Sequence, residues 1–301
     1  MSKEMIILAL MDGLSQAAVL FLVALGMTLV FGVMNIVNMA HGSFYALGGY
    51  MAASLGLWAS AHGASPAWSL LILPLAAIII GCVFGALMET TLMQRIYQKD
   101  PILQLLITFS AFMIFEDLQR LVWGTQPYFV SEIVNYLGTI DVLGITYTRY
   151  QLLLLPGVAL TVFLVLRSFL KFSSMGRQIV AVSHHREMST ALGINVRRIS
   201  LLTFVVSAVL GALAGALASP TVSWVPGIGG EMIVLSFAVV ATAGLGQIEG
   251  ALVAALLIGV ARSFTVYLLP EIEVLVPFLI MVLVLLFRPQ GLFSVAQARR
   301  V

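Results

Sequence analysis

The stretch FGVMNIVNMAHGSFYALGGYMAAS, residues 31–54, decides the fold because it interrupts strongly apolar sequence with polar residues and glycines. It lies in a region without charge, since no Asp, Glu, Lys or Arg occurs between Asp12 and Glu89. An uncharged region of this length is typical of membrane-spanning helices and not of a soluble core. Polar backbone at membrane depth is tolerated only where protein or water covers it. The stretch therefore indicates a broken membrane helix.

The composition of the whole chain agrees with a membrane protein. The 301 residues have a mean hydropathy of +1.08, and 9% of them are charged, whereas soluble domains have about 25%. The apolar runs do not alternate with polar residues, which excludes a transmembrane β-barrel. The sequence thus predicts an all-α polytopic membrane protein.

Nine apolar segments approach the length that a helix needs to cross a membrane. They are residues 6–30, 43–59, 68–93, 102–122, 150–170, 199–218, 232–245, 251–269 and 274–287. Shorter segments, such as 232–245, are candidates for broken or re-entrant helices. We predict one transmembrane domain over residues 1–301 with eight or nine spans.

The distribution of Lys and Arg predicts the orientation. Segment 167–198 contains six basic residues and one acid, and we place it in the cytoplasm. Segment 123–148 contains acids but no Lys or Arg, and we place it outside. Arg288, Arg299 and Arg300 place the C-terminal end inside. Nine full spans then put the N-terminus outside, whereas a re-entrant early segment would put it inside.

The sequence lacks the motifs of several kinds of chemistry. None of its three lysines lies in a phosphate-binding loop, and its histidines do not have metal-ligand spacing. We therefore expect no catalytic residues, no metal, no cofactor and no nucleic-acid partner. A membrane protein of this kind most often moves a solute. A channel and an intramembrane enzyme are the competing interpretations from other classes.

The two halves of the chain contain a weak echo of each other. NMAHGSFYALGGYMAASLG (38–56) resembles PGIGGEMIVLSFAVVATAGLG (226–246) in its small residues around a break. Inverted repeats with broken helices are common in transporters.

Ionisable residues within spans are candidates for function, and here these are Glu231, Glu249 and Arg262. We interpret the two glutamates as helix caps.

The cytoplasmic segment contains HREMSTALGINVRR, residues 185–198. A short helix can begin near Glu187, where an acid suits the positive end of a helix, and end at Gly193. Such a helix is either a solvated connector or a surface that a partner grips.

Three motifs in the chain resemble one permease family. They are GMTLVFGVMNIVNMAHGSFYALGGYMAA (26–53), GRQIVAVSHHREMSTALGINVRRISLLTFVVSAVLGALAGAL (176–217) and FRPQGLF (287–293). The chain is similar to the membrane subunits of ATP-binding cassette importers for branched-chain amino acids. The resemblance implies a permease in the bacterial cytoplasmic (inner) membrane, embedded in lipid. It implies as partners a second homologous permease subunit, two ATP-binding subunits and a periplasmic solute-binding protein.

The resemblance also implies roles for particular residues. A cytoplasmic coupling loop, residues 171–198, is expected to contact the ATPase. Its coupling residues are Arg186, Glu187, Ala191, Gly193 and Ile194. The expected substrates are branched-chain or other neutral amino acids, and the alternatives within this architecture are urea, short amides and organic carboxylates.

The interrupted stretch is the predicted substrate pathway. The polar candidates are Asn35, Asn38, His41, Ser43 and Tyr45. Helical spacing of three predicts that Asn38 and His41 share one face. The alternative interpretation is that these residues hold helices together inside the subunit.

Overall fold

The computed structural model describes residues 3–293, and its helices coincide with the apolar runs. Six helices within this range are long and apolar enough to cross a membrane, namely Lys3–Met34, Pro66–Ile96, Pro101–Trp123, Tyr150–Phe172, Val196–Ala218 and Ile248–Leu268. Three further apolar helices are α2 (His41–Ala61), α12 (Ile228–Ala243) and α14 (Val276–Phe287). The prediction of an all-α polytopic membrane fold is confirmed.

Four of the long helices are regular and carry the labels α1 (Lys3–Met34), α6 (Pro101–Trp123), α11 (Val196–Ala218) and α13 (Ile248–Leu268). The other two contain π-helical turns. Tyr150–Phe172 consists of η4 (Tyr150–Leu154) and α8 (Leu155–Phe172). Pro66–Ile96 consists of η1 (Pro66–Trp68), α3 (Ser69–Ile80), η2 (Gly81–Gly85), α4 (Ala86–Met88), η3 (Glu89–Met93) and α5 (Gln94–Ile96).

Polar side chains cap the first turns of two of the long helices. Asp100 precedes Pro101, and its Oδ1 accepts a hydrogen bond from the backbone N–H of Ile102 at 2.8 Å. Asn195 caps α11 in the same way, because its Oδ1 accepts from the N–H of Arg198 at 3.0 Å. Both side chains satisfy backbone donors that the first helical turn leaves unpaired.

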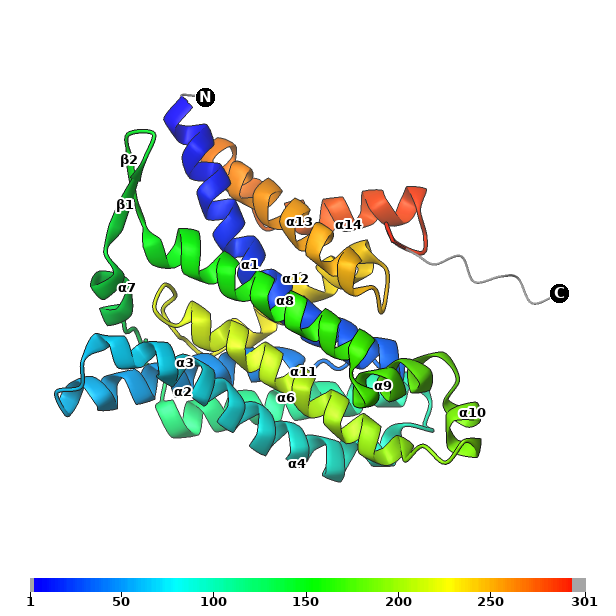
Figure 1. The fold of residues 1–301 in the computed structure, drawn as a ribbon. Helices are drawn as coiled ribbons and strands as arrows, with labels where there is room; N and C mark the ends of the chain where they lie inside the picture. Colours follow the sequence, from blue (N-terminus) through cyan, green and yellow to red (C-terminus); the bar gives the residue numbers. More distant parts are fainter. Residues whose placement is uncertain (1–2, 294–301) are drawn as a thin grey trace.

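Small polar elements lie at the two ends of the bundle (Figure 1). One end carries α7 (Glu132–Leu137) and a hairpin of β1 (Thr139–Val142) with β2 (Ile145–Thr148), in which Thr139 pairs with Thr148. The short η5 (Pro270–Ile272) follows α13. The opposite end carries α9 (Ser174–His184) and α10 (Arg186–Ala191).

The first helix forms the centre of the fold. α1 packs against α8, α11, α12 and α13. Of its most apolar window, 83% is buried, compared with 22% for the span Tyr150–Phe172. The outer spans expose large aliphatic side chains, such as Leu121 and Leu286, at the surface that lipid covers in a membrane.

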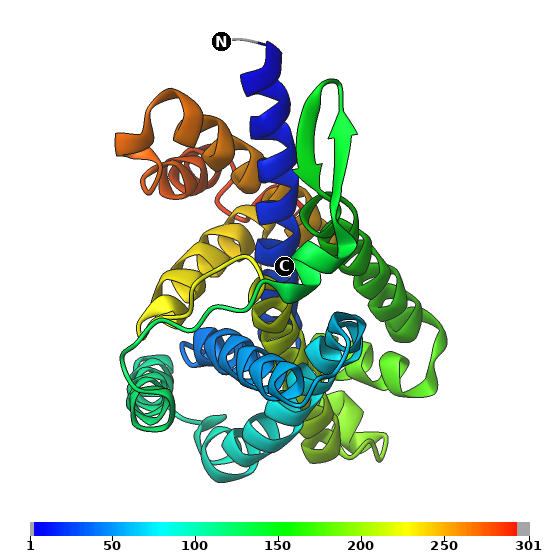
Figure 2. The ribbon, with the colours of Figure 1, turned by 90° about the vertical axis from the view of Figure 1, so that its left-hand side faces the viewer.

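The N-terminal end of α1 lies beside the hairpin, as Figures 1 and 2 both show. The hydroxyls of Tyr147 and Tyr267 each donate to the carboxylate of Asp12 at 2.5 Å. This contact places the N-terminal part of α1 at the same end of the bundle as segment 123–148. Arg299 and Arg300, two of the residues used to orient the C-terminal end, lie outside the described residues.

Candidate functional site

The break between α1 and α2 is built from a left-handed residue and an asparagine turn. Asn35 has a φ of +56°, a conformation in which Asn is enriched among non-glycine residues. Asn38 lies before α2, and its Oδ1 accepts from the N–H of Ala40 at 3.1 Å. The argument that helical spacing puts Asn38 and His41 on one face is wrong, because Asn38 is in the turn and the helix begins at His41.

The predicted pathway residues have different surroundings. Asn35 is exposed, while Asn38, His41, Ser43 and Tyr45 are buried. The Nε2 of His41 lies 3.0 Å from the carbonyl oxygen of Val23 in α1. The structure therefore brings His41 into contact with α1, whereas Tyr45 lines a cavity.

Glycines allow the helices around this break to come very close. A Cβ on Gly26 would lie 2.8 Å from Cε1 of His41, so the glycine makes room for the imidazole. Cβ atoms on Gly48 and Gly49 would overlap Ala212 of α11 and the ring of Trp224. Small residues permit such approaches between membrane helices.

The second of the two similar stretches, residues 226–246, also contains a break before a helix. α12 begins after Gly227, whose φ is +99°. A Cβ on Gly229 would lie 2.7 Å from the carbonyl oxygen of Gly42, which is the second residue of α2. The first turns of α2 and α12 thus lie against each other, and the two echoing sequences meet in space.

A cavity of about 290 Å³ lies beside these two first turns. Its walls come from α1, α2, η4, α8, α11, α12 and α13 and from the polar segment after α11. Aliphatic side chains form much of the lining, among them Val19, Leu20, Leu155, Met232 and Leu235. Tyr45, Gln16 and Gln151 add polar groups to the same cavity.

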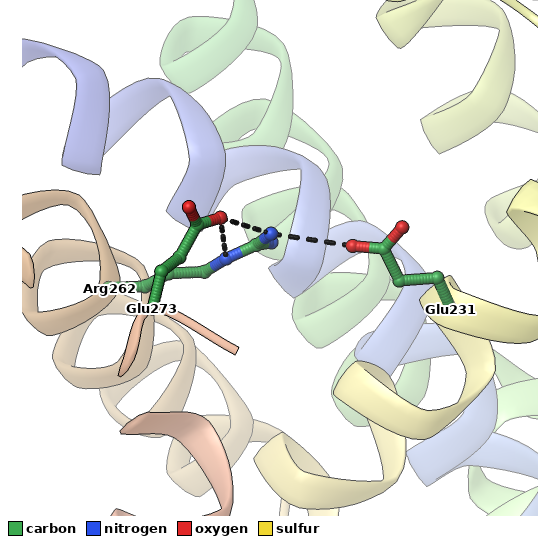
Figure 3. A network of polar contacts seen from close by, with 3 residues as sticks. All are labelled: Glu231, Arg262 and Glu273. Carbon is green, nitrogen blue, oxygen red and sulfur yellow. Dashed lines mark hydrogen bonds and ion pairs between the residues drawn. The ribbon is translucent and has the colours of Figure 1, made fainter. Parts of the chain in front are cut away.

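Three charged residues form a network at this cavity (Figure 3). Arg262 of α13 donates from Nε and Nη2 to Oε1 of Glu273, at 3.1 and 2.7 Å. The same Nη2 lies 3.3 Å from Oε1 of Glu231, in the first turn of α12. Arg262 and Glu231 line the cavity. Two carboxylates therefore share one guanidinium next to a largely aliphatic wall.

The sequence interpretation of Glu231 as a helix cap misses its pairing with Arg262. The signal that could have found the pair is the rarity of ionisable residues in apolar spans. Their partnership depends on the contact between α12 and α13, which residue spacing does not reveal. Glu249 lies in the first turn of α13, as a capping acid would, and its Oε1 is 3.6 Å from Nε of Arg167.

The short helix predicted within residues 185–198 is present as α10. Gly193 follows it with a φ of +81°, the conformation that a glycine at the end of a helix adopts. Arg186, Glu187, Ala191 and Gly193 are exposed, and Ile194 is half-buried. Met188 and Leu192 expose 63% and 78% of their area one helical turn apart.

One side of α10 is fixed to the transmembrane helices. The guanidinium of Arg186 lies over the ring of Tyr97, 4.9 Å from its centroid. The hydroxyl of Tyr97 donates to Glu89, which is fully buried, and lies 3.4 Å from Sδ of Met34. This contact chain connects α10 with the span Pro66–Ile96 and with the end of α1.

Comparisons with known proteins agree with this architecture. The family described as branched-chain amino acid transport system / permease component matches residues 9–285. The high-affinity branched-chain amino acid transport system permease protein LivH of Salmonella typhimurium is 27% identical over 296 residues, 96% of each chain. Its counterpart BraD of Pseudomonas aeruginosa is 28% identical over 298 residues, 97% of each chain.

A more distant similarity extends to a sugar permease. The ribose import permease protein RbsC of Haemophilus influenzae is 26% identical over 257 residues, 82% of this chain and 73% of the relative. No solved structure matches the chain.

Proposed function

Because the chain belongs to the family of permease components of branched-chain amino acid transport systems, we propose that it forms the translocation pathway of an importer for branched-chain or other neutral amino acids. The chain is a transport subunit and not an enzyme, and it lies in the cytoplasmic membrane. Membership of this family of ATP-binding cassette importers implies an ATPase and a solute-binding protein as partners.

The observation that carries the proposed substrate class is the lining of the cavity beside Tyr45. An aliphatic amino acid needs an apolar wall for its side chain and charged or polar groups for its head. Leu20, Leu155 and Leu235 supply the wall, and Glu231 and Arg262 supply the charges. Ligand sites commonly combine mostly apolar linings with a few placed polar groups.

Tyr45 connects this cavity with the predicted pathway. It is the one pathway candidate from the interrupted stretch that lines the cavity, while His41 and Ser43 lie nearby in the same helix. We place the substrate route along the break between α1 and α2, with Tyr45 at the cavity. Asn35, Asn38, His41 and Ser43 as contacts along that route stay a prediction.

The proposed coupling to the ATPase rests on α10 within the loop 171–198. Met188 of α10 and Leu192, which follows it, offer an exposed apolar surface to a partner, flanked by Glu187, Ala191 and Gly193. A displacement of α10 is transmitted through the contacts of Arg186 with Tyr97 and of Tyr97 with Met34 to the end of α1. It therefore changes the position of the break that starts at Asn35. In this arrangement a second homologous permease completes the membrane part, and two ATP-binding subunits dock at the end that carries α10.

Reconstitution tests the proposed function. The chain is assembled in proteoliposomes with a second permease, both ATPase subunits and a solute-binding protein. Labelled leucine, valine, urea, acetamide and isocaproate are offered outside, with ATP inside. We expect ATP-dependent uptake of the two amino acids. Uptake of urea, acetamide or isocaproate in their place would contradict the proposed substrate class.

A further inference from the structure

The charged network at the cavity is unequally paired. The contact from Arg262 to Glu273 is short, at 2.7 Å, whereas that to Glu231 is 3.3 Å. The side chain of Glu231 is 63% exposed, compared with 27% for Glu273 and 18% for Arg262. Arg262 and Glu273 thus form a sheltered pair, and Glu231 is a second carboxylate held loosely beside it.

This arrangement has a net negative charge beside a largely aliphatic wall. One guanidinium faces two carboxylates, and ionisable groups at membrane depth are costly unless they are paired. Arg262 is the one basic side chain among the cavity-lining residues, all of which lie within residues 3–293. This charge balance favours a ligand that brings a positive charge with N–H donors.

We infer that Glu231 and Arg262 hold the charged head of an α-amino acid in transit, with Glu231 accepting from the α-ammonium group and Arg262 donating to the α-carboxylate. This inference rests on the proposed function. The ligand enters between the two side chains at their long contact. Each protein charge then exchanges one partner for another, so no charge is left unpaired.

The same arrangement selects against ligands that have only one part of this head. A carboxylate without an ammonium group would leave Glu231 unpaired and would add a third negative charge. An amine without a carboxylate would draw Glu231 away from Arg262 and would give the guanidinium no carboxylate in its place. Neutral amides and urea would gain no ion pair. A zwitterion is the chemical class that matches both groups.

The aliphatic wall accounts for the rest of the ligand. Leu20, Leu155 and Leu235 line the cavity together with the network. A space of about 290 Å³ is near the lower limit of about 300 Å³ for small-ligand sites. A compact aliphatic side chain therefore fits this space better than a large aromatic one.

Glu249 provides a matched control for Glu231. Both glutamates are in the first turn of a helix, both pair with an arginine, and their side chains are 56% and 63% exposed. Glu249 does not line this cavity. The variants Glu231→Gln, Glu231→Asp and Glu249→Gln are therefore compared in the assembled importer.

Two measurements test the inference. The first is the number of leucine molecules imported per ATP hydrolysed at saturating loaded binding protein. The second is direct binding of leucine, isocaproate and isoamylamine to the assembled importer in nanodiscs without the binding protein. Glu231→Gln should lower leucine affinity about tenfold or more, because a hydrogen bond to a charged group is lost. Glu231→Asp should recover part of the affinity, and Glu249→Gln should match the wild type.

The outcomes separate this inference from the proposed function. If the wild type imports leucine and Glu231→Gln does so with unchanged affinity and stoichiometry, the assigned head-group site is wrong while the proposed function stands. Equal binding of isocaproate and leucine by the wild type would also overturn it. If Glu231→Gln fails to assemble, the test uses Glu231→Asp. An assembled Asp variant that binds leucine, isocaproate and isoamylamine with the affinities of the wild type would contradict the assigned head-group site. Failure of the wild type to import any amino acid overturns both.

Discussion

Gly42 and Gly229 lie in direct contact, so that the first turn of α2 rests on the first turn of α12. A Cβ on Gly229 would lie 2.7 Å from the carbonyl oxygen of Gly42, and a Cβ on Gly42 would overlap the carbonyl oxygen of Gly229. The two broken segments therefore meet at a point that leaves no room for a side chain, next to the proposed substrate cavity.

Gly42→Ala should destabilise the subunit. The added methyl group meets backbone that cannot move aside as a side chain can, and overpacking of this kind costs about 1–3 kcal/mol. The melting temperature of the purified importer should fall. Gly157→Ala in α8 is the control, because nothing lies within 4 Å of its Cβ position. An unchanged melting temperature for Gly42→Ala would mean that the two helices are farther apart than described.

Gly193→Trp should uncouple ATP hydrolysis from loaded binding protein while the subunit still inserts. Gly193 has a φ of +81° with open space around it, so the effect arises from backbone strain and from bulk at the partner surface. Gly193→Asn should retain more activity, because Asn tolerates this conformation. Gly144→Trp, in the hairpin at a φ of +87° with open space, is the matched control. Normal stimulation in Gly193→Trp would remove α10 from the coupling role.

Tyr97→Phe should weaken coupling without removing the ring over which Arg186 lies. Burial, followed by the nearby Glu89, raises the pKa of Tyr97, so its hydroxyl stays a donor at neutral pH. Removing it leaves a buried carboxylate without that donor, at a cost of about 1–3 kcal/mol. Stimulated ATPase activity is the measurement, and Tyr136→Phe on exposed α7 is the control. If an assembled Tyr97→Phe importer shows the ATPase stimulation of the wild type, the hydrogen bond from Tyr97 to Glu89 does not contribute to coupling.

His41→Leu distinguishes the two interpretations of the interrupted stretch. Its imidazole contacts the carbonyl oxygen of Val23 and is almost fully buried. As a pathway contact, the residue is needed for uptake in a complex that assembles normally. As a helix contact, its loss reduces the amount of assembled complex in proportion to uptake. We expect reduced uptake per assembled complex, and chromatography of the solubilised importer supplies the second quantity.

The orientation can be checked by labelling intact cells in a Cys82-free background. An impermeant thiol reagent should modify Asn135→Cys on α7 and leave Ser183→Cys on α9 unmodified until the membrane is opened. Both positions are exposed in the structure, so burial does not explain a difference. Labelling of Ser183→Cys from outside would invert the orientation.

The apolar runs predict the helices well because, in a bilayer, uncharged length alone determines a span. The end of α10 at Gly193 was also predictable, since a glycine there is a local backbone signal. The pairing of Glu231 with Arg262 was not, because it depends on how α12 packs against α13. The error at Asn38 is local, because its side chain caps a turn and the helix starts later, at His41.

The burial of α1 has a consequence for the order of biosynthesis. α1 is made before α11, α12 and α13, against which it packs. Until α13 is made, the carboxylate of Asp12 lacks the hydroxyl of Tyr267, one of its two donors. α1 therefore remains only partly packed, in the membrane or in the insertion machinery, until α13 has been made. Truncated nascent chains should keep α1 accessible to crosslinkers until α13 has emerged.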